Sequence, residues 1–347
     1  MVTRIGLVGC GTVGTGLIEM LDRKRDFLRE RHNFDFSLVF VSDAIKGTVF
    51  SKTGLDTAEI LKEIAARGGM FESRYAGNGP DKLEGLLREA RPDIVCEAAP
   101  TDYKTGEPGM TILSSALKAG ASAVTSSKGA IGLNMAGLKK LAIENGVHLR
   151  FESSVLSGTP LINLVRGPLA GCSLSKAEGI VNGTTNYMLT RMEAGLGYDE
   201  ALEEAQRLGY AEADPTGDVE GFDAAVKVCI MSAEFFGVEL RVDEVRRTGI
   251  TGVTAADVAN AAKSGRRIKL IAGASREGGS AAAYVEPRAV DLANPLASVS
   301  GATNAVSIVT DNLGEITISG PGAGKKETAQ GILSDMIDIV SMRYQSG

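Results

Sequence analysis

The stretch from Gly209 to Cys229 gathers the most reactive-looking set of ionisable residues in the chain. It has the sequence GYAEADPTGDVEGFDAAVKVC, in which the carboxylates of Glu212, Asp218 and Asp223 precede a single lysine, Lys227. Lys227 lies in AAVKVCIMSA, a run apolar enough to be buried. Because Asp223 comes four residues earlier, a helix would place these two side chains on the same face.

Two interpretations of the Asp223–Lys227 pair stay open. A surface ion pair with i,i+4 spacing would contribute about 0.2–0.5 kcal/mol to stability. A buried lysine is instead either paired or lowered in pKa, which suits a proton donor near neutral pH. The apolar residues around Lys227 weaken the first interpretation and favour an acid–base role.

The neighbouring acids differ in what else could explain them. We expect a long helix that begins at Thr216 or Gly217 and runs to Phe236. Asp218 would lie in its first turn, where an acid is stabilising for purely structural reasons. Glu212 lies before that turn and has no such explanation.

A glycine-rich motif follows the first expected strand. Thr3–Val8 is an apolar run typical of a parallel strand buried on both faces, and GCGTVG comes directly after it and before a helix. Glycines let the backbone approach a pyrophosphate, and a helix N-terminus favours its negative charge. The sequence therefore predicts dinucleotide binding by Gly9, Gly11, Thr12, Val13 and Gly14.

The end of the next expected strand, Ser37–Val41, bears on which dinucleotide is bound. Asp43 follows this strand, where an acid would bind the ribose hydroxyls and favour NAD. Lys46 and Lys52 could instead hold the 2′-phosphate of NADP. Asp43 could equally be a cap or turn residue. The sequence leaves NAD and NADP both open.

Two more candidate ligand-binding residues follow expected strands. Pro92–Glu97 leads into a polar loop that contains Thr101, and Ser122–Ser126 leads to Lys128. Open α/β sheets bind ligands at the carboxyl ends of their strands, so both residues are candidate contacts. The alternatives are an ordinary loop hydroxyl for Thr101 and a solvated lysine for Lys128.

Two polar turns have both a structural and a functional interpretation. The strand Val147–Glu152 continues into ESSVLSGTP, where one carboxylate and several backbone carbonyls form the oxygen set that hard cations bind. Taken alone, a turn with a solvated acid is the simpler interpretation. Thr184 lies in NGTTN at the start of another expected helix, which it could merely cap.

Length and composition indicate an ordinary globular protein with two domains. The 347 residues exceed what one hydrophobic core usually serves, and we place the first boundary near residue 150. Beyond Gly237, short β runs predict a second, largely one-sided sheet. The chain is therefore expected to be an α/β protein with a parallel-sheet domain and a second domain that contains this other sheet.

Charge and residue usage exclude several classes of function. The net charge of −6, without a basic patch, argues against nucleic-acid and membrane partners. No apolar run reaches the roughly 20 residues that span a bilayer, and the N-terminus has no signal-peptide pattern. The four separated cysteines are typical of reduced thiols, so we expect a cytoplasmic protein. With only two histidines, a His-based zinc site or a catalytic triad is disfavoured.

Taken together, the motifs resemble those of the homoserine dehydrogenases over essentially the whole chain. The similar blocks, in family order, are GLVGCGTVG, APTDYKTGEP, SSKGAIG, ESSVLSGTPLI, EGIVNGTTNYML, GYAEADPTGDVEGFDAAVK and GPGAGKKETA. The resemblance implies a Rossmann-type domain over residues 1–150, completed by about 320–347 through a returning C-terminal helix. Residues 151–319 would form an α+β domain for substrate binding, catalysis and dimerisation.

The resemblance also implies an activity. The family interconverts L-aspartate 4-semialdehyde and L-homoserine with NAD(P), in threonine, methionine and isoleucine biosynthesis, and its members are homodimers. Many relatives append a regulatory domain that has no counterpart after Gly347, so feedback inhibition through such a domain is not expected.

Residue roles follow from the matched motifs. Lys227 matches the proton donor to the aldehyde oxygen, Glu212 and Asp223 match substrate-binding acids, and Lys128 matches a lysine that contacts cofactor and substrate. The substrate carboxylate would need donors such as Lys128 or the backbone at Thr184. Further cofactor contacts are implied at Thr101, Gly209 and Gly322. A Na⁺ or K⁺ site is implied at Glu152 with the carbonyls of Val155, Ser157 and Thr159. For ESSVLSGTP the resemblance therefore favours a cation site over a turn with a solvated acid.

Two rival functions share parts of this pattern. One is another NAD(P)-dependent amino-acid or semialdehyde dehydrogenase of the same fold; the phosphate-dependent acylating kind needs a histidine base, and neither His32 nor His148 lies in a matching block. The other is a non-catalytic, dinucleotide-binding redox sensor. Such a sensor has no need of the acids around Lys227.

Overall fold

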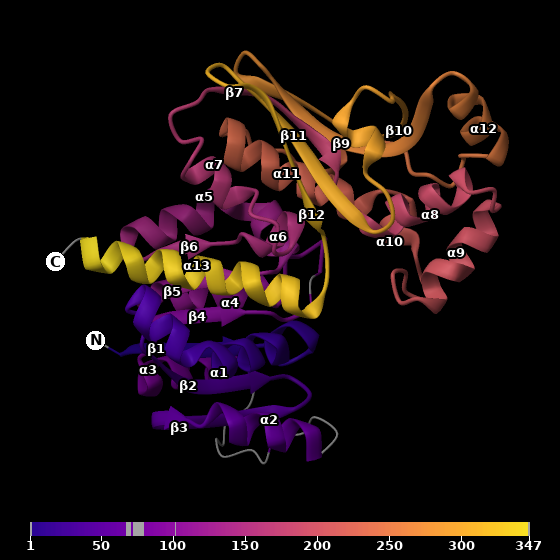
Figure 1. The fold of residues 1–347 in the computed structure, drawn as a ribbon. Helices are drawn as coiled ribbons and strands as arrows, with labels where there is room; N and C mark the ends of the chain where they lie inside the picture. The colour runs from indigo at the N-terminus through magenta and orange to yellow at the C-terminus, as the bar shows by residue number, and fades with distance from the viewer. Residues whose placement is uncertain (1, 67–70, 72–79, 101, 346–347) are drawn as a thin grey trace. The chain divides into compact units, whose positions relative to one another are not determined.

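The chain folds into two compact units, of which the computed structural model describes residues 2–66, 71, 80–100 and 102–345 (Figure 1). The first unit joins residues 1–158 to residues 324–347, and the second comprises residues 159–323. The first unit is therefore made from both ends of the chain.

A six-stranded sheet in the order β3-β2-β1-β4-β5-β6 forms the centre of the first unit. Five strands run parallel, as in a Rossmann-type fold: β1 (Thr3–Val8), β2 (Phe36–Asp43), β4 (Ile94–Glu97), β5 (Ser122–Thr125) and β6 (Leu149–Arg150). Because helices cover both faces of such a sheet, its strands are almost continuously apolar. This confirms the expected fold class.

The remaining strand, β3 (Gly47–Leu55), pairs antiparallel with β2 at the edge of the sheet. The sequence predicted no strand here; Leu55 ends β3, and the next helix begins at Thr57. An edge strand pairs on one side only and tolerates polar residues. The sequence GTVFSKTGL therefore lacks the apolar pattern of the buried strands.

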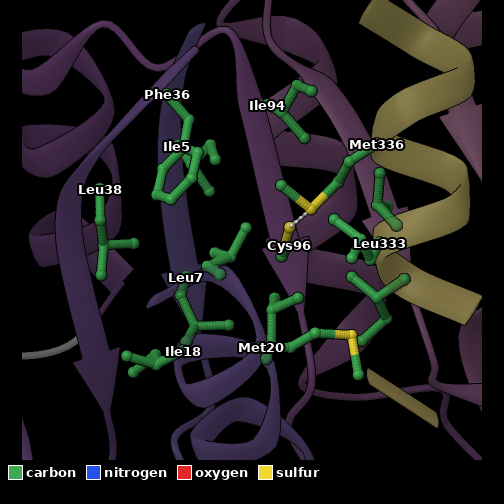
Figure 2. Packing of buried hydrophobic residues seen from close by; sticks show 14 of the residues in the cluster. Ile5, Leu7, Ile18, Met20, Phe36, Leu38, Ile94, Cys96, Leu333 and Met336 are labelled. Atoms are coloured by element: carbon green, nitrogen blue, oxygen red, sulfur yellow. Dashed lines mark hydrogen bonds between the residues drawn. The ribbon is translucent and has the colours of Figure 1, made fainter. Parts of the chain in front are cut away.

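The helices of the first unit include one from the end of the chain. Their bounds are α1 (Thr12–His32), α2 (Thr57–Ala66), α3 (Pro80–Ala90), α4 (Gly109–Lys118), α5 (Lys128–Glu144), α6 (Ser153–Leu156) and α13 (Lys325–Gln345). Helix α13 packs beside α1, and its buried Leu333 and Met336 join the core formed by the strands (Figure 2). The Cys96 Sγ lies 3.5 Å from the Met336 Sδ. The expected return of the C-terminal helix to the first domain is confirmed.

The second unit contains a sheet in the order β12-β11-β7-β9-β10-β8. Its strands are β7 (Leu174–Ile180), β8 (Arg246–Arg247), β9 (Arg266–Glu277), β10 (Ser280–Asp291), β11 (Thr303–Thr310) and β12 (Gly314–Pro321). All neighbours are antiparallel except β8 and β10. Its helices are α7 (Ile162–Arg166), α8 (Gly183–Glu193), α9 (Tyr198–Arg207), α10 (Thr216–Val219), α11 (Phe222–Phe236) and α12 (Ala255–Lys263), with short 3₁₀ turns at Val242–Glu244 and Pro295–Ser298.

The expected long helix from Thr216 or Gly217 to Phe236 is in fact two helices, α10 and α11, so that prediction is wrong. Gly221 separates them with a left-handed backbone, φ +79°. A residue with this φ cannot continue a right-handed helix, and glycine adopts it without steric cost. The break sets Asp218 on α10 and Asp223 on α11 at an angle that one continuous helix would not allow.

Candidate active site

Lys227 lies near the middle of α11 and is 4% exposed. Its Nζ is 2.7 Å from Asp223 Oδ2 and donates a hydrogen bond of 2.6 Å to the carbonyl oxygen of Val181, just beyond the end of β7. Asp223 is itself buried. The buried interpretation of this pair is therefore confirmed: the two side chains meet on one helical face and are enclosed, unlike a surface ion pair.

Asn182 connects this pair to a second acid. Its Nδ2 donates to Asp223 Oδ2 at 3.0 Å and to Asp218 Oδ1 at 2.6 Å, while its Oδ1 accepts from the Thr185 backbone at 2.9 Å. The side chain thus caps α8 and bridges two carboxylates. The sequence did not single out this residue, although an asparagine beside buried acids has two amide protons to donate.

Burial and charge shift the pKa of Asp218. Removal from water raises the pKa of this carboxyl, and the nearby charge of Asp223 raises it further. The hydrogen bond from Asn182 and the charge of Lys227 act in the opposite direction, but the net pKa is above the ordinary value for aspartate. Asp218 therefore belongs to the same electrostatic cluster as Lys227, in addition to its place in the first turn of α10.

The other predicted substrate residues are arranged differently. Glu212 is exposed on the loop after α9, and its side chain makes no hydrogen bond or ion pair with the part of the chain that is described. The loop itself is fixed through the Glu212 carbonyl, which accepts from Gln206 Nε2 at 3.0 Å. Thr184 is buried in the first turn of α8 and donates to the Tyr210 carbonyl at 2.6 Å. Gly209 follows α9 with φ +78°.

The glycine-rich loop of the first unit has the geometry that a dinucleotide requires. Gly9 and Gly14 are tightly packed: a Cβ on Gly9 would lie 2.5 Å from the Ala98 backbone, and one on Gly14 would lie 2.1 Å from the Gly9 carbonyl oxygen. Gly11 has no atom within 4 Å of such a Cβ, and α1 begins at Thr12. An open glycine before a helix N-terminus, with Val13 in the first turn, fits a bound pyrophosphate.

Asp43 closes the neighbouring turn. Its carboxylate accepts backbone N–H groups from Cys10 at 2.7 Å, Ile45 at 2.9 Å and Lys46 at 3.0 Å. Burial disfavours the ionised form, but these hydrogen bonds and the charge of Lys46 outweigh it and lower the pKa of Asp43. The Lys46 ammonium donates to the Cys10 carbonyl oxygen. Asp43 is therefore both a turn residue and an ionised group beside the glycine loop.

The remaining candidates are found in three places. Lys128 is the first residue of α5 and half-buried, directly after the buried Ser127. Gly322 packs against Asn304, whose Nδ2 would lie 1.9 Å from a Cβ at this position. Thr101 lies outside the described residues.

The predicted cation-binding residues lie on one short segment. Glu152 is 1% exposed, Val155 is in α6, and Ser157 has a left-handed backbone at φ +57°. The Glu152 backbone N–H donates to buried Asp335 at 2.8 Å. Thr159 is the first residue of the second unit. A buried carboxylate within a carbonyl-rich turn fits a hard monovalent cation in its chemistry.

A Rossmann-type unit with an open glycine loop and a second unit with a buried lysine–acid cluster are the parts expected of an NAD(P)-dependent oxidoreductase. Residues 9–152 match the family profile described as homoserine dehydrogenase, NAD binding domain, and residues 160–337 match the profile of homoserine dehydrogenase itself. The chain therefore belongs to the homoserine dehydrogenase family.

Relatives and solved structures agree with this family. An NAD(+)-dependent homoserine dehydrogenase from Pseudomonas canavaninivorans is 43% identical over 97% of this chain and 96% of that protein. A putative homoserine dehydrogenase from Archaeoglobus fulgidus has a similar structure, with a TM-score of 0.87 and 39% identity over 97% and 99% of the two chains. A mutant hyperthermophilic archaeal enzyme in complex with NADPH has a TM-score of 0.83 and 31% identity, covering 98% of each.

Proposed function

We propose that this chain reduces L-aspartate 4-semialdehyde to L-homoserine, reversibly and with NAD or NADP, as the family name suggests. The observation that carries this proposal is the buried Lys227, held 2.7 Å from Asp223 and bonded to the Val181 carbonyl. A lysine fixed in this way can transfer a proton at one defined position. The pathway to threonine, methionine and isoleucine, and a cytoplasmic location, are part of the same proposal.

The reaction requires a hydride transfer and a proton transfer. A bound nicotinamide supplies or accepts the hydride. Lys227 gives a proton to the carbonyl oxygen of the substrate as the alcohol forms. Asp223 holds the Lys227 ammonium in place. General acid catalysis of this kind is worth about 10²–10⁴ in rate. In the reverse direction the same lysine takes the proton back.

The acids suit a zwitterionic substrate. The substrate ammonium needs carboxylates, for which Asp223, Asp218 and the exposed Glu212 are the candidates. Asn182 reduces the repulsion between the two buried aspartates by donating to both. The substrate carboxylate needs donors, and we assign it to Lys128 and the backbone at Thr184.

The coenzyme is assigned to the glycine loop, Asp43 and the residues at Lys128, Thr101, Gly209 and Gly322. We propose a preference for NAD, because the Asp43 carboxylate would repel a 2′-phosphate, and Lys46 already donates to the Cys10 carbonyl. We further propose that residues 1–150 with 320–347 act as the coenzyme domain, and 151–319 as the catalytic and dimerisation domain of a homodimer.

The decisive experiment compares two variants, Lys227→Ala and Lys263→Ala. Lys263 is an exposed lysine of the same unit and serves as the control. Initial rates with homoserine and NAD or NADP should be lost in the first variant and unchanged in the second. NADH should still bind to Lys227→Ala, as followed by NADH fluorescence, which is convenient because the chain has no tryptophan. Full turnover by Lys227→Ala would rule out its role, and no homoserine turnover by the wild type would favour a non-catalytic sensor.

A Na⁺ or K⁺ ion held by Glu152 with the carbonyls of Val155, Ser157 and Thr159 is also proposed. Thermal unfolding in sodium or potassium chloride should then occur at higher temperature than in a bulky organic cation at equal ionic strength. Glu152→Gln should abolish the difference, because it removes the only formal charge of the set. Equal unfolding temperatures in all three salts would contradict the cation site.

A further inference from the structure

Glu97, the last residue of β4, is a fully buried carboxylate that no proposed step uses. In the sheet its direct neighbours are Val8 on β1 and Thr125 on β5, so it lies at the carboxyl ends of the central strands. These ends carry the loops to which we assign the coenzyme. A buried acid at this position needs a reason, because an apolar residue would be accommodated at lower cost.

The hydrogen bonds of Glu97 run to both adjacent loops. Oε1 accepts the backbone N–H of Ala99 at 2.8 Å, in the loop after β4, and Oε2 accepts the hydroxyl of Thr125. The Thr125 Oγ1 accepts in turn from the Ser127 backbone at 2.8 Å, in the loop after β5. A single carboxylate thus connects the two loops that follow β4 and β5.

Both loops contact residues that are predicted to bind the coenzyme. Ala98 and Ala99 pack directly on Gly9, the first glycine of the nucleotide loop, where a Cβ would lie 2.5 Å from the Ala98 backbone. Ser127 immediately precedes Lys128 and occupies the N-cap position of α5. Any displacement of Ala99 or Ser127 would therefore be transmitted to the glycine loop and to Lys128.

Ionisation of Glu97 has an energetic cost. Burial raises the pKa of Glu97 to about 7, even though the hydrogen bonds from Thr125, Ala99 and Ser127 favour the ionised form. A group whose only task was to fill the core would not need this charge. A carboxylate can accept at both oxygens at once, whereas the glutamine amide presents one acceptor and one donor.

We propose that Glu97 is a positioning residue for coenzyme binding, which holds the loop after β4 and the start of α5 in register beneath the nicotinamide dinucleotide. This inference rests on the proposed function, since it assumes that the loops at these strand ends bind NAD(H). Thr125 is the second residue of the connection, because it links Glu97 to the Ser127 backbone.

The test uses direct binding of NADH to the full chain, together with steady-state kinetics. Glu97→Gln replaces one of the two acceptor oxygens with an amide donor, so the side chain cannot accept from both Ala99 and Thr125. Thr125→Val removes the hydroxyl at nearly constant volume. Both should weaken NADH binding about tenfold or more, since each breaks a hydrogen bond to a charged group. Thr125→Ser keeps the hydroxyl and should restore affinity to within about twofold of the wild type.

A merely structural role would have a different result. In that case the variants would lower the unfolding temperature, but the folded fraction would bind NADH with unchanged affinity, and this would overturn the proposal. Equal NADH affinity for Thr125→Val and Thr125→Ser would overturn it as well. If Glu97→Gln fails to fold, the two Thr125 variants decide. A wild type that binds NADH but does not oxidise homoserine would contradict the proposed function and leave this comparison intact.

Discussion

Lys227 and Glu97 are two buried ionisable residues with opposite relations to their surroundings. Lys227 has an acid within 2.7 Å, so its charge is compensated by a partner of opposite sign. Glu97 is surrounded by neutral donors, which stabilise a negative charge by hydrogen bonding alone. Burial raises the pKa of Glu97 to about 7, even though its hydrogen bonds favour the ionised form.

The raised pKa of Glu97 predicts a pH dependence of stability. Its pKa is about 7 in the folded chain and near 4.5 when exposed, so between these values the folded state binds more protons. The contribution of Glu97 to the free energy of unfolding is therefore highest below about pH 4.5 and falls by roughly 3 kcal/mol as the pH rises to 7.

Urea unfolding of the wild type and Glu97→Gln at several pH values measures this effect. The stability of the wild type relative to the variant should decrease as the pH rises from 5 to 8, since glutamine does not titrate. The exposed Glu84→Gln serves as the matched control for a glutamate on the protein surface. A difference for Glu97→Gln that is also independent of pH would show that this carboxyl has an ordinary pKa in the folded protein.

At the level of elements, the break between α10 and α11 shapes the site. Gly221 allows the chain to turn between Asp218 and Asp223, so that the Asn182 amide reaches both. A continuous helix would place residues five positions apart on different faces, because each residue advances by 100°. The site thus depends on one backbone conformation in addition to its side chains.

Gly221→Ala should destabilise the chain by about 1–3 kcal/mol and reduce homoserine turnover. An alanine pays for the left-handed φ, and its Cβ would lie 3.0 Å from Val285 Cγ1. Gly217→Ala is the matched control, because this glycine of α10 has open space at its Cβ and no positive φ. Chemical denaturation and initial rates test both variants, and equal behaviour of the two would mean that the break is not required.

The same elements show what could be predicted from the sequence. Long apolar runs predicted the parallel strands, and the strand–glycine–helix order predicted the nucleotide loop, because these signals are local. The edge strand β3 was missed, since pairing on one side imposes little pattern. Gly221 was missed because a glycine within an expected helix does not disclose its φ. The bridging role of Asn182 depends on contacts between residues 36 and 41 positions apart, which no local pattern records.

At the level of the whole molecule, the first unit is discontinuous in sequence. Helix α13 contributes Leu333 and Met336 to a core that otherwise comes from residues 5–124 (Figure 2). No helix of the described ranges is long and apolar enough to cross a bilayer. The nucleotide loop thus rests on a core that the last part of the chain completes.

Leu333→Ala should lower the free energy of unfolding by about 2–5 kcal/mol, because Leu333 is 1% exposed and its truncation leaves a cavity. The exposed Lys326→Ala on the same helix should change it by less than about 0.5 kcal/mol. Saturating NADH should recover part of the loss, since a ligand that binds only the folded state stabilises it. Differential scanning fluorimetry with and without NADH measures all three effects, and an unchanged unfolding temperature for Leu333→Ala would contradict the role of α13 in this core.

The discontinuity also has a consequence for biosynthesis. A ribosome releases the chain from its N-terminus, so residues 2–158 emerge well before α13. The growing chain can begin the coenzyme-binding sheet early but leaves its apolar surface uncovered while residues 159–323 are translated. A nascent chain stalled before Lys325 should therefore be a better substrate for chaperones and proteases than the completed chain, and the ability to retain a dinucleotide should be acquired only at the last stage of translation.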